Sequence, residues 1–186
     1  MPQPLYPQPS KGHFKYFPLE VASKRPKHAA GIGAVTSEWS FFETELVATI
    51  ARCFFAFSAE GGFNAAHTTL GFIDSITLRL EIISELLETR IPPEDFKHFQ
   101  DVLIKEIRNR AKERNAVVHS YWYADDQHPE YIITWIDERY MKYSAQDFLD
   151  IAKRILETND KVKNFLEQFT KWDGVGPWQS MHWPEG

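Results

Sequence analysis

The chain has 186 residues, of which 43% are hydrophobic, 15% aromatic and 25% charged. This length suits one domain with a sizeable core, and this composition excludes an intrinsically disordered chain. The net charge of −5 is uneven, because residues 1–35 carry five bases against one acid, a net +4, which leaves −9 on residues 36–186. An acidic body excludes tight, nonspecific binding to nucleic acid, which depends on neutralising many phosphates. Any nucleic-acid function is therefore expected at a local site.

Cysteine and histidine usage argues against disulfide and metal chemistry. The single cysteine, Cys53, lies in an apolar run and cannot form a disulfide within the chain. No pair of the seven histidines has the spacing of a helical metal site, so we expect neither a metal nor a cofactor. The sequence also contains no signal-peptide core and no apolar stretch that could span a bilayer. We expect a cytoplasmic protein without a membrane partner.

The N-terminal part of the chain is predicted to be an arm followed by a helix. Residues 1–35 are rich in proline and bases and show no sustained periodicity, which is typical of an extended or poorly ordered segment unless it docks on another surface. Its apolar residues favour an arm packed on the body or on a second subunit over a free tail: Leu5, Tyr6, Phe14, Tyr16, Phe17 and Leu19. A first helix is predicted from Thr36 or Ser37, which are good N-cap residues, to about Ser58. Its buried face is predicted from apolar residues at intervals of three and four: Trp39, Phe42, Leu46, Ile50 and Phe54.

Two further long helices are predicted next. The second extends from about Asn64 to Thr89, where a regular apolar face ends before Pro92 and Pro93. Proline followed by two acids suits a first helical turn, so the third helix is predicted from about Pro93 to His119. Its apolar face comprises Phe96, Phe99, Leu103, Ile107, Ala111 and Val118.

The pattern then changes to that of strands and returns to a helix. The aromatic and β-branched runs 121–123 and 131–135 flank a polar stretch and predict a short hairpin. Ser144 and Asp147 resemble a capping box and open a fourth helix, which ends near Phe169. We thus predict a mainly α fold with four main helices and a short β-hairpin after the third, in a domain over 36–171 with a tryptophan-rich tail over 172–186.

The third helix combines a basic face with an unusually placed arginine. A helical projection brings polar residues to one face at intervals of 3, 4, 3 and 4: Lys105, Arg108, Lys112, Asn115 and His119. The same projection places Arg114 on the apolar face. A buried guanidinium needs an anionic partner, so Arg114 either pairs with an acid such as Glu43 or Asp74 or lines a cleft that accepts an anion. His119 could also serve only as a helix-terminal cap.

Arg114-Asn115-(three residues)-His119, on the third long helix of a four-helix pattern, resembles the R-x(4 to 6)-H motif of the HEPN superfamily. The similarity extends to Trp39 and Glu43 in the first helix, the long second helix, Trp122 after the histidine, the hairpin and the Ser-capped last helix, over about residues 37–169. The chain departs from many relatives of this shape in having Ser120, instead of glycine, after the histidine.

The resemblance implies a metal-independent endoribonuclease in which Arg114 and His119 of two subunits meet in a cleft of a homodimer. Histidine can move a proton near neutral pH and arginine can stabilise charge on a phosphate. Asn115 could orient the phosphate or the ring, and Arg108 and Lys112 could steer the RNA backbone. Ordinary solvated helix charges also account for the last two.

A second hypothesis belongs to a different functional class. HEPN-like bundles include members that are not nucleases and act as binding, toxin-neutralising or assembly modules. The acidic body favours this interpretation, with Arg114 as a structural residue and an antitoxin or another protein as the partner. The intact spacing from Arg114 to His119 favours the enzyme.

Overall fold

We analysed a computed structural model of the chain, which describes residues 2–6, 22–54, 68–73, 75–125 and 128–169. Its elements are β1 (Gln3–Pro4), α2 (Pro26–Phe54), α4 (Ile76–Glu88), α5 (Pro93–His98), the π-helical turn η1 (Phe99–Leu103), α6 (Ile104–Val118), β2 (Tyr123–Ala124), β3 (Tyr131–Ile136), β4 (Arg139–Ser144) and α7 (Ala145–Glu167). The prediction of a mainly helical fold is confirmed, and the strands form one small antiparallel sheet.

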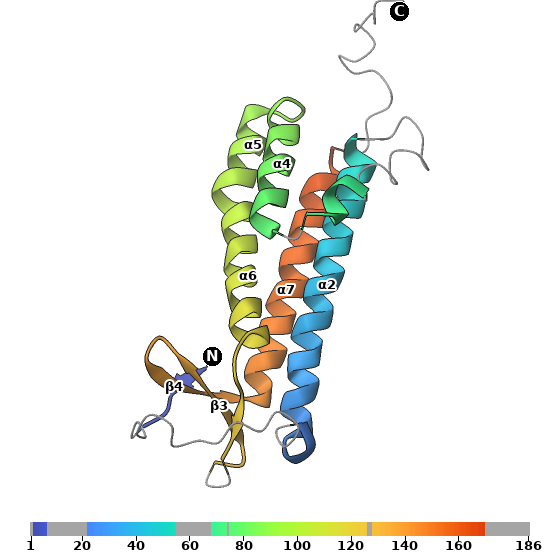
Figure 1. Cartoon of the computed structure of the whole chain (residues 1–186). Coiled ribbons are helices and arrows are strands. Elements are labelled where there is room, and N and C mark those ends of the chain that lie inside the picture. The colour runs from blue at the N-terminus through green and yellow to red at the C-terminus, as the bar shows by residue number, and fades with distance from the viewer. Residues whose placement is uncertain (1, 7–21, 55–67, 74, 126–127, 170–186) are drawn as a thin grey trace, which may run out of the picture.

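The long helices bring three chain segments to one end of the molecule, beside the sheet (Figure 1). Helices α2 and α7 lie side by side and both begin at the sheet, whereas α6 runs in the opposite direction and ends there. The core between them is apolar, and its largest fully buried side chains include Phe42, Leu46, Ile50, Ile83, Phe99, Ile107, Phe148 and Ile155. The C-terminal end of α6 therefore lies at the same end of the molecule as the sheet and the starts of α2 and α7.

Helix α2 begins at Pro26, so the prediction that residues 26–35 belong to an extended arm is wrong. Proline fits the first helical turn, and His28 and Val35 are buried on the same side of the helix. A Cβ at Gly31 would lie 2.7 Å from the Cβ of Phe148, so glycine here permits close packing of α2 on α7. The density of prolines before this segment concealed its helical periodicity. The predicted end of this helix, near Ser58, lies outside the described residues.

The second predicted helix is shorter than expected. Helix α4 begins at Ile76, with the Ser75 hydroxyl accepting a hydrogen bond from the Leu78 N–H at 3.4 Å, and a separate helical turn precedes it at 68–71. The carbonyl of Ile73 lies in the break between these two helices. It accepts a hydrogen bond from the Nε–H of Arg79 at 2.6 Å. The predicted start at Asn64 lies outside the described residues.

The third helix is confirmed over its full length, as α5, η1 and α6 follow one another without a break. Phe99, Leu103, Ile107 and Ala111 are buried as predicted. At its end the buried residue is Val117, whereas the predicted Val118 is half-buried.

The sheet contains the predicted pairing and an additional hairpin. Tyr123 of β2 pairs with Ile133 of β3 as expected, but the longer hairpin joins β3 to β4, a strand that the sequence analysis missed. Its turn residues Asp137 and Glu138 both have positive φ, 47° and 63°, without the glycine or asparagine that usually marks such a turn. Strand β1 pairs with β4, giving the order β1-β4-β3-β2.

The fourth helix is confirmed at its start, where the Ser144 side chain accepts from the Asp147 N–H and Asp147 accepts from the Ser144 N–H. This capping box fixes where β4 ends and α7 begins. The tryptophan-rich tail over 172–186 lies outside the described residues.

Candidate functional site

The C-terminal end of α6 is held by three hydrogen bonds to its last carbonyls. The indole N–H of Trp122 donates to the carbonyl of Val117 at 3.0 Å, and the hydroxyl of Ser120 donates to the carbonyl of Ala116. The backbone N–H of His119 donates to the carbonyl of Asn115 at 3.0 Å. Because these carbonyls would otherwise lack a partner at a helix end, the bonds stabilise the helix terminus that carries His119. The serine at 120 thus supplies a capping hydroxyl to the end of α6.

An aromatic cluster attaches this helix end to the rest of the molecule. The ring of Trp122 contacts those of Tyr143 and Phe148 edge-on, with centroids 5.0 and 5.2 Å apart, and Phe148 in turn contacts His28 on α2. Burial, together with the negative charges of Asp147 and Glu113, raises the pKa of Tyr143 to about 12. Tyr143 therefore stays neutral and acts as a packing residue. The cluster positions the end of α6 on α7, β4 and α2 together.

Arg114 has no carboxylate partner in the described part of the chain. Its side chain is half-buried, one Nη donates to the Oδ1 of Asn115 at 3.0 Å, and its buried Nε has no hydrogen-bond partner there. Glu43, one of the two possible partners named from the sequence, instead binds Arg79 at 3.1 Å. The other possible partner, Asp74, lies outside the described residues. None of the described carboxylates binds the Arg114 guanidinium.

The remaining predicted site residues lie on the solvent side of α6. His119 and Asn115 are exposed, and Arg108 and Lys112 are exposed on the same face, as the projection predicted. His119 is the fifth residue after Arg114, which corresponds to about 140° around the helix and about 7.5 Å along it. One chain therefore presents the two side chains in different directions from one helix end.

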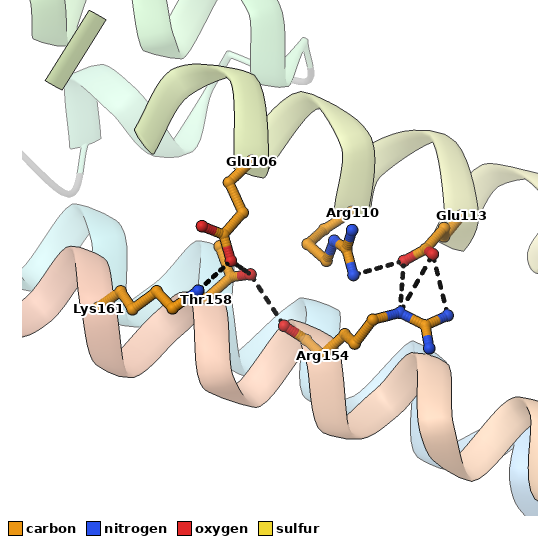
Figure 2. A network of polar contacts seen from close by, with 6 residues as sticks. All are labelled: Glu106, Arg110, Glu113, Arg154, Thr158 and Lys161. Atoms are coloured by element: carbon orange, nitrogen blue, oxygen red, sulfur yellow. Dashed lines mark hydrogen bonds and ion pairs between the residues drawn. The ribbon is translucent and has the colours of Figure 1, made fainter. Parts of the chain in front are cut away.

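Sequence reasoning missed a second group of charges on α6, which faces α7 (Figure 2). Glu113 binds Arg110 at 3.0 Å and Arg154 at 2.9 Å, and Glu106 binds Lys161 at 2.7 Å. Although burial alone would raise it, the pKa of Glu106 lies below its usual value because Lys161 and Thr158 donate hydrogen bonds to the carboxylate. The sequence contained a signal for this group, because polar or charged residues recur at intervals of four and then three on both helices. They stand at 106, 110 and 113 and at 154, 158 and 161.

A small hollow elsewhere shares no residue with this site. It has a volume of about 250 Å³ and is lined by Ser40, Glu43, Thr44, Val47, Gly71 and Arg79. Its two charged residues bind each other, so they offer no net charge to a ligand. Within the ranges that the structure describes, no group of three or more His, Cys, Asp or Glu side chains is placed to hold a metal ion.

Comparisons with protein-family models, with curated proteins and with solved structures found no match to this chain. Among the described helices, none is both long enough and apolar enough to cross a membrane.

Proposed function

We propose that this chain is a HEPN-like, metal-independent endoribonuclease whose Arg114 and His119 act in a composite site of a homodimer. The observation that carries the proposal is an arginine without a carboxylate partner among the described residues, placed five residues before an exposed histidine on an anchored helix end. The arrangement of the helices as a HEPN bundle is part of the proposal, supported by the order and polarity of α2, α6 and α7.

The proposed chemistry uses the RNA's own 2′-hydroxyl as the nucleophile. That oxygen attacks the adjacent phosphorus, the P–O5′ bond breaks, and the products are a cyclic 2′,3′-phosphate and a free 5′-hydroxyl. His119 takes the proton from the 2′-hydroxyl or supplies one to the leaving 5′-oxygen. Arg114 stabilises the negative charge that gathers on the phosphate oxygens, and Asn115, which accepts a hydrogen bond from Arg114, orients the guanidinium. Arg108 and Lys112 attract the RNA backbone.

The dimer follows from the directions of the two side chains. With Arg114 and His119 about 140° apart on one helix, a second copy is the simplest source of the missing group at each site. A twofold axis beside the end of α6 would bring His119 of each subunit toward Arg114 of the other.

The primary test is incubation of purified protein with mixed RNA in EDTA, beside Arg114→Ala and His119→Ala. Wild type should cleave and both variants should not, with all three retaining the same circular dichroism spectrum. Absence of cleavage by a folded wild-type dimer would contradict the proposal.

Mixing the two inactive variants tests the composite site. If subunits exchange, half of the dimers are mixed and each has one intact site of two, so about one quarter of wild-type activity should return. No recovery, despite exchange demonstrated by differently tagged subunits, would exclude a site shared between subunits. Light scattering that gives only monomer at micromolar concentration would exclude the dimer.

A second candidate function is a non-catalytic HEPN-like module that binds a protein partner, such as an antitoxin. The net charge of −9 on residues 36–186 favours it, because an acidic surface repels RNA away from the local site. In that case His119→Ala leaves all measured behaviour unchanged, and no RNA is cleaved under any condition.

A further inference from the structure

The sheet beside the end of α6 has two faces of different character. Alternate residues of β3 point to opposite sides, and Ile132 lies on the inner side, in the main core with Tyr143. Ile133 and Tyr140 lie on the outer side and are buried there, in a separate small cluster with Leu5. Among the described residues, this cluster contains none from the long helices.

Aromatic and basic side chains share this outer face. Tyr131 and Trp135 lie on it at the two ends of β3, and Lys142 of β4 is paired across from Ile133, midway between them. Trp135 is 39% exposed, although aromatic rings of this size are usually well buried. Its ring contacts that of Tyr140 edge-on at 4.6 Å, and Nζ of Lys142 lies 4.6 Å from the centre of the Tyr131 ring. The rings are thus held in place rather than loosely attached.

We propose that the outer face of the sheet, defined by Tyr131, Trp135 and Lys142, binds single-stranded RNA by stacking a base on the Trp135 ring. This inference rests on the proposed ribonuclease function and names the form of its substrate. An exposed aromatic ring on a sheet can stack an unpaired base of any sequence, and a cation nearby can neutralise a phosphate of the same strand. The ammonium of Lys142, which lies over the Tyr131 ring, supplies that cation, and Tyr131 lies about 13 Å from Trp135 along the strand.

The position of the sheet connects this surface to the end of α6. Only four residues lead from His119 to Tyr123 of β2, so the two lie within about 14 Å of each other. Tyr121, within that link, is 64% exposed. Both described ends of the basic N-terminal arm also lie at this end of the molecule, where Lys24 and Lys27 are exposed (Figure 1). A strand bound on the sheet would therefore continue toward His119 past basic residues.

The edges of the sheet make a protein strand the weaker alternative. Pairing of an added strand requires a long free edge, whereas the two outermost strands here, β1 and β2, contain two residues each. The aromatic and basic side chains lie on the face of the sheet and not along an edge. Duplex RNA cannot present its bases to flat rings. Unpaired RNA is the occupant that fits.

The test is binding of a short, unstructured, fluorescently labelled RNA to full-length protein carrying His119→Ala, which prevents cleavage during the measurement. Adding Trp135→Ala should weaken binding by about 5- to 150-fold, as expected for loss of one stacked base, whereas Trp135→Tyr should retain most of the affinity. Leu156→Ala serves as the matched control, since Leu156 is a similarly exposed apolar residue, at 41%, on α7. The same RNA in a duplex should bind weakly to all variants.

Lys142→Gln provides a second measurement that does not depend on removing a large ring. It should reduce the slope of log Kd against log salt by about 0.7, the contribution of one neutralised phosphate of a single strand. Unchanged RNA affinity in Trp135→Ala together with an unchanged salt slope in Lys142→Gln would overturn the proposal and leave the face to a protein contact. So would failure of the His119→Ala protein to bind the single strand.

Cleavage by the protein with His119 intact separates this inference from the proposed function. Binding that depends on Trp135, without any cleavage, would support the sheet surface and remove the ribonuclease. Cleavage that is equally fast in wild type and Trp135→Ala would support the ribonuclease and would exclude the sheet surface as its RNA-binding site.

Discussion

Charged residues occur at two places along α6, and they differ in how they are neutralised. Along the side that faces α7, Glu106, Arg110 and Glu113 form ion pairs or hydrogen bonds with side chains of α7 or of α6 itself. At the C-terminal end, Arg114 contacts only the amide of Asn115 among the described side chains, and His119 is exposed. The first arrangement satisfies charges inside the protein and stabilises the packing of two helices. The second leaves the guanidinium and the imidazole without a carboxylate partner among the described residues.

The largest expected effect is on catalysis and concerns the C-terminal end of α6. Arg114→Ala should lower RNA cleavage by about 10²- to 10³-fold, because it removes the group that stabilises the phosphate charge. Its free energy of unfolding should change by less than about 1 kcal/mol, since no ion pair is lost in the described region. Cleavage rates and urea unfolding measure the two effects. A large loss of stability with unchanged cleavage would make Arg114 a structural residue.

The next effect concerns the paired charges. Glu113→Ala leaves two guanidinium groups, of Arg110 and Arg154, without their shared carboxylate. We expect a loss of about 1–3 kcal/mol in the free energy of unfolding, below the value for a fully buried pair because these side chains are partly exposed. Lys153→Ala, which removes an exposed pair within α7, is the control and should cost less than about 0.5 kcal/mol. Equal effects of the two substitutions would show that the contacts between α6 and α7 contribute no special stability.

Two glycines of α2 test how the end of α6 is supported. Gly31→Ala should destabilise the fold by about 1–3 kcal/mol, because its Cβ would overlap Phe148, which supports Trp122. Gly33→Ala, with no atom within 4 Å of the added carbon, should stabilise α2 by about 0.5–1 kcal/mol. Thermal unfolding should therefore shift in opposite directions. Shifts of the same sign would contradict the observed packing of α2 on α7.

The smallest effect is a pH dependence at the same end of the molecule. Burial, with a contribution from the charge of Arg25, lowers the pKa of His28, whose Nε2 bonds the Glu130 carbonyl at 3.1 Å. The unfolded chain therefore takes up a proton at higher pH than the folded protein, so stability falls as pH decreases through about 6.5. His28→Gln should lose less stability than wild type between pH 8 and pH 5, measured by urea unfolding. Identical pH profiles would indicate that His28 titrates alike in both states.

The sequence predictions were confirmed where the signal came from residues close together in the chain. The helix from Pro93 to His119 and the capping box at Ser144 depend on residues close together in the chain, and both are confirmed. The start of α2 was misjudged because its buried side is defined by Phe148, far along the chain. Strand β4 was missed because its turn, Asp137–Glu138, lacks the usual residues. Of the two acids that the sequence offered as possible partners of Arg114, Glu43 instead binds Arg79.

By itself the sequence determined the helix from Pro93 to His119 and the start of α7, which face of α6 is polar, and that His119 is the fifth residue after Arg114. These properties depend on helical periodicity and capping, which act within a few residues. Only the tertiary structure decided which charges find partners. Glu113 forms an ion pair because α7 runs antiparallel to α6 and places Arg154 beside it. No described acid binds Arg114. Pairing depends on distances between helices, and these arise from packing of the whole core.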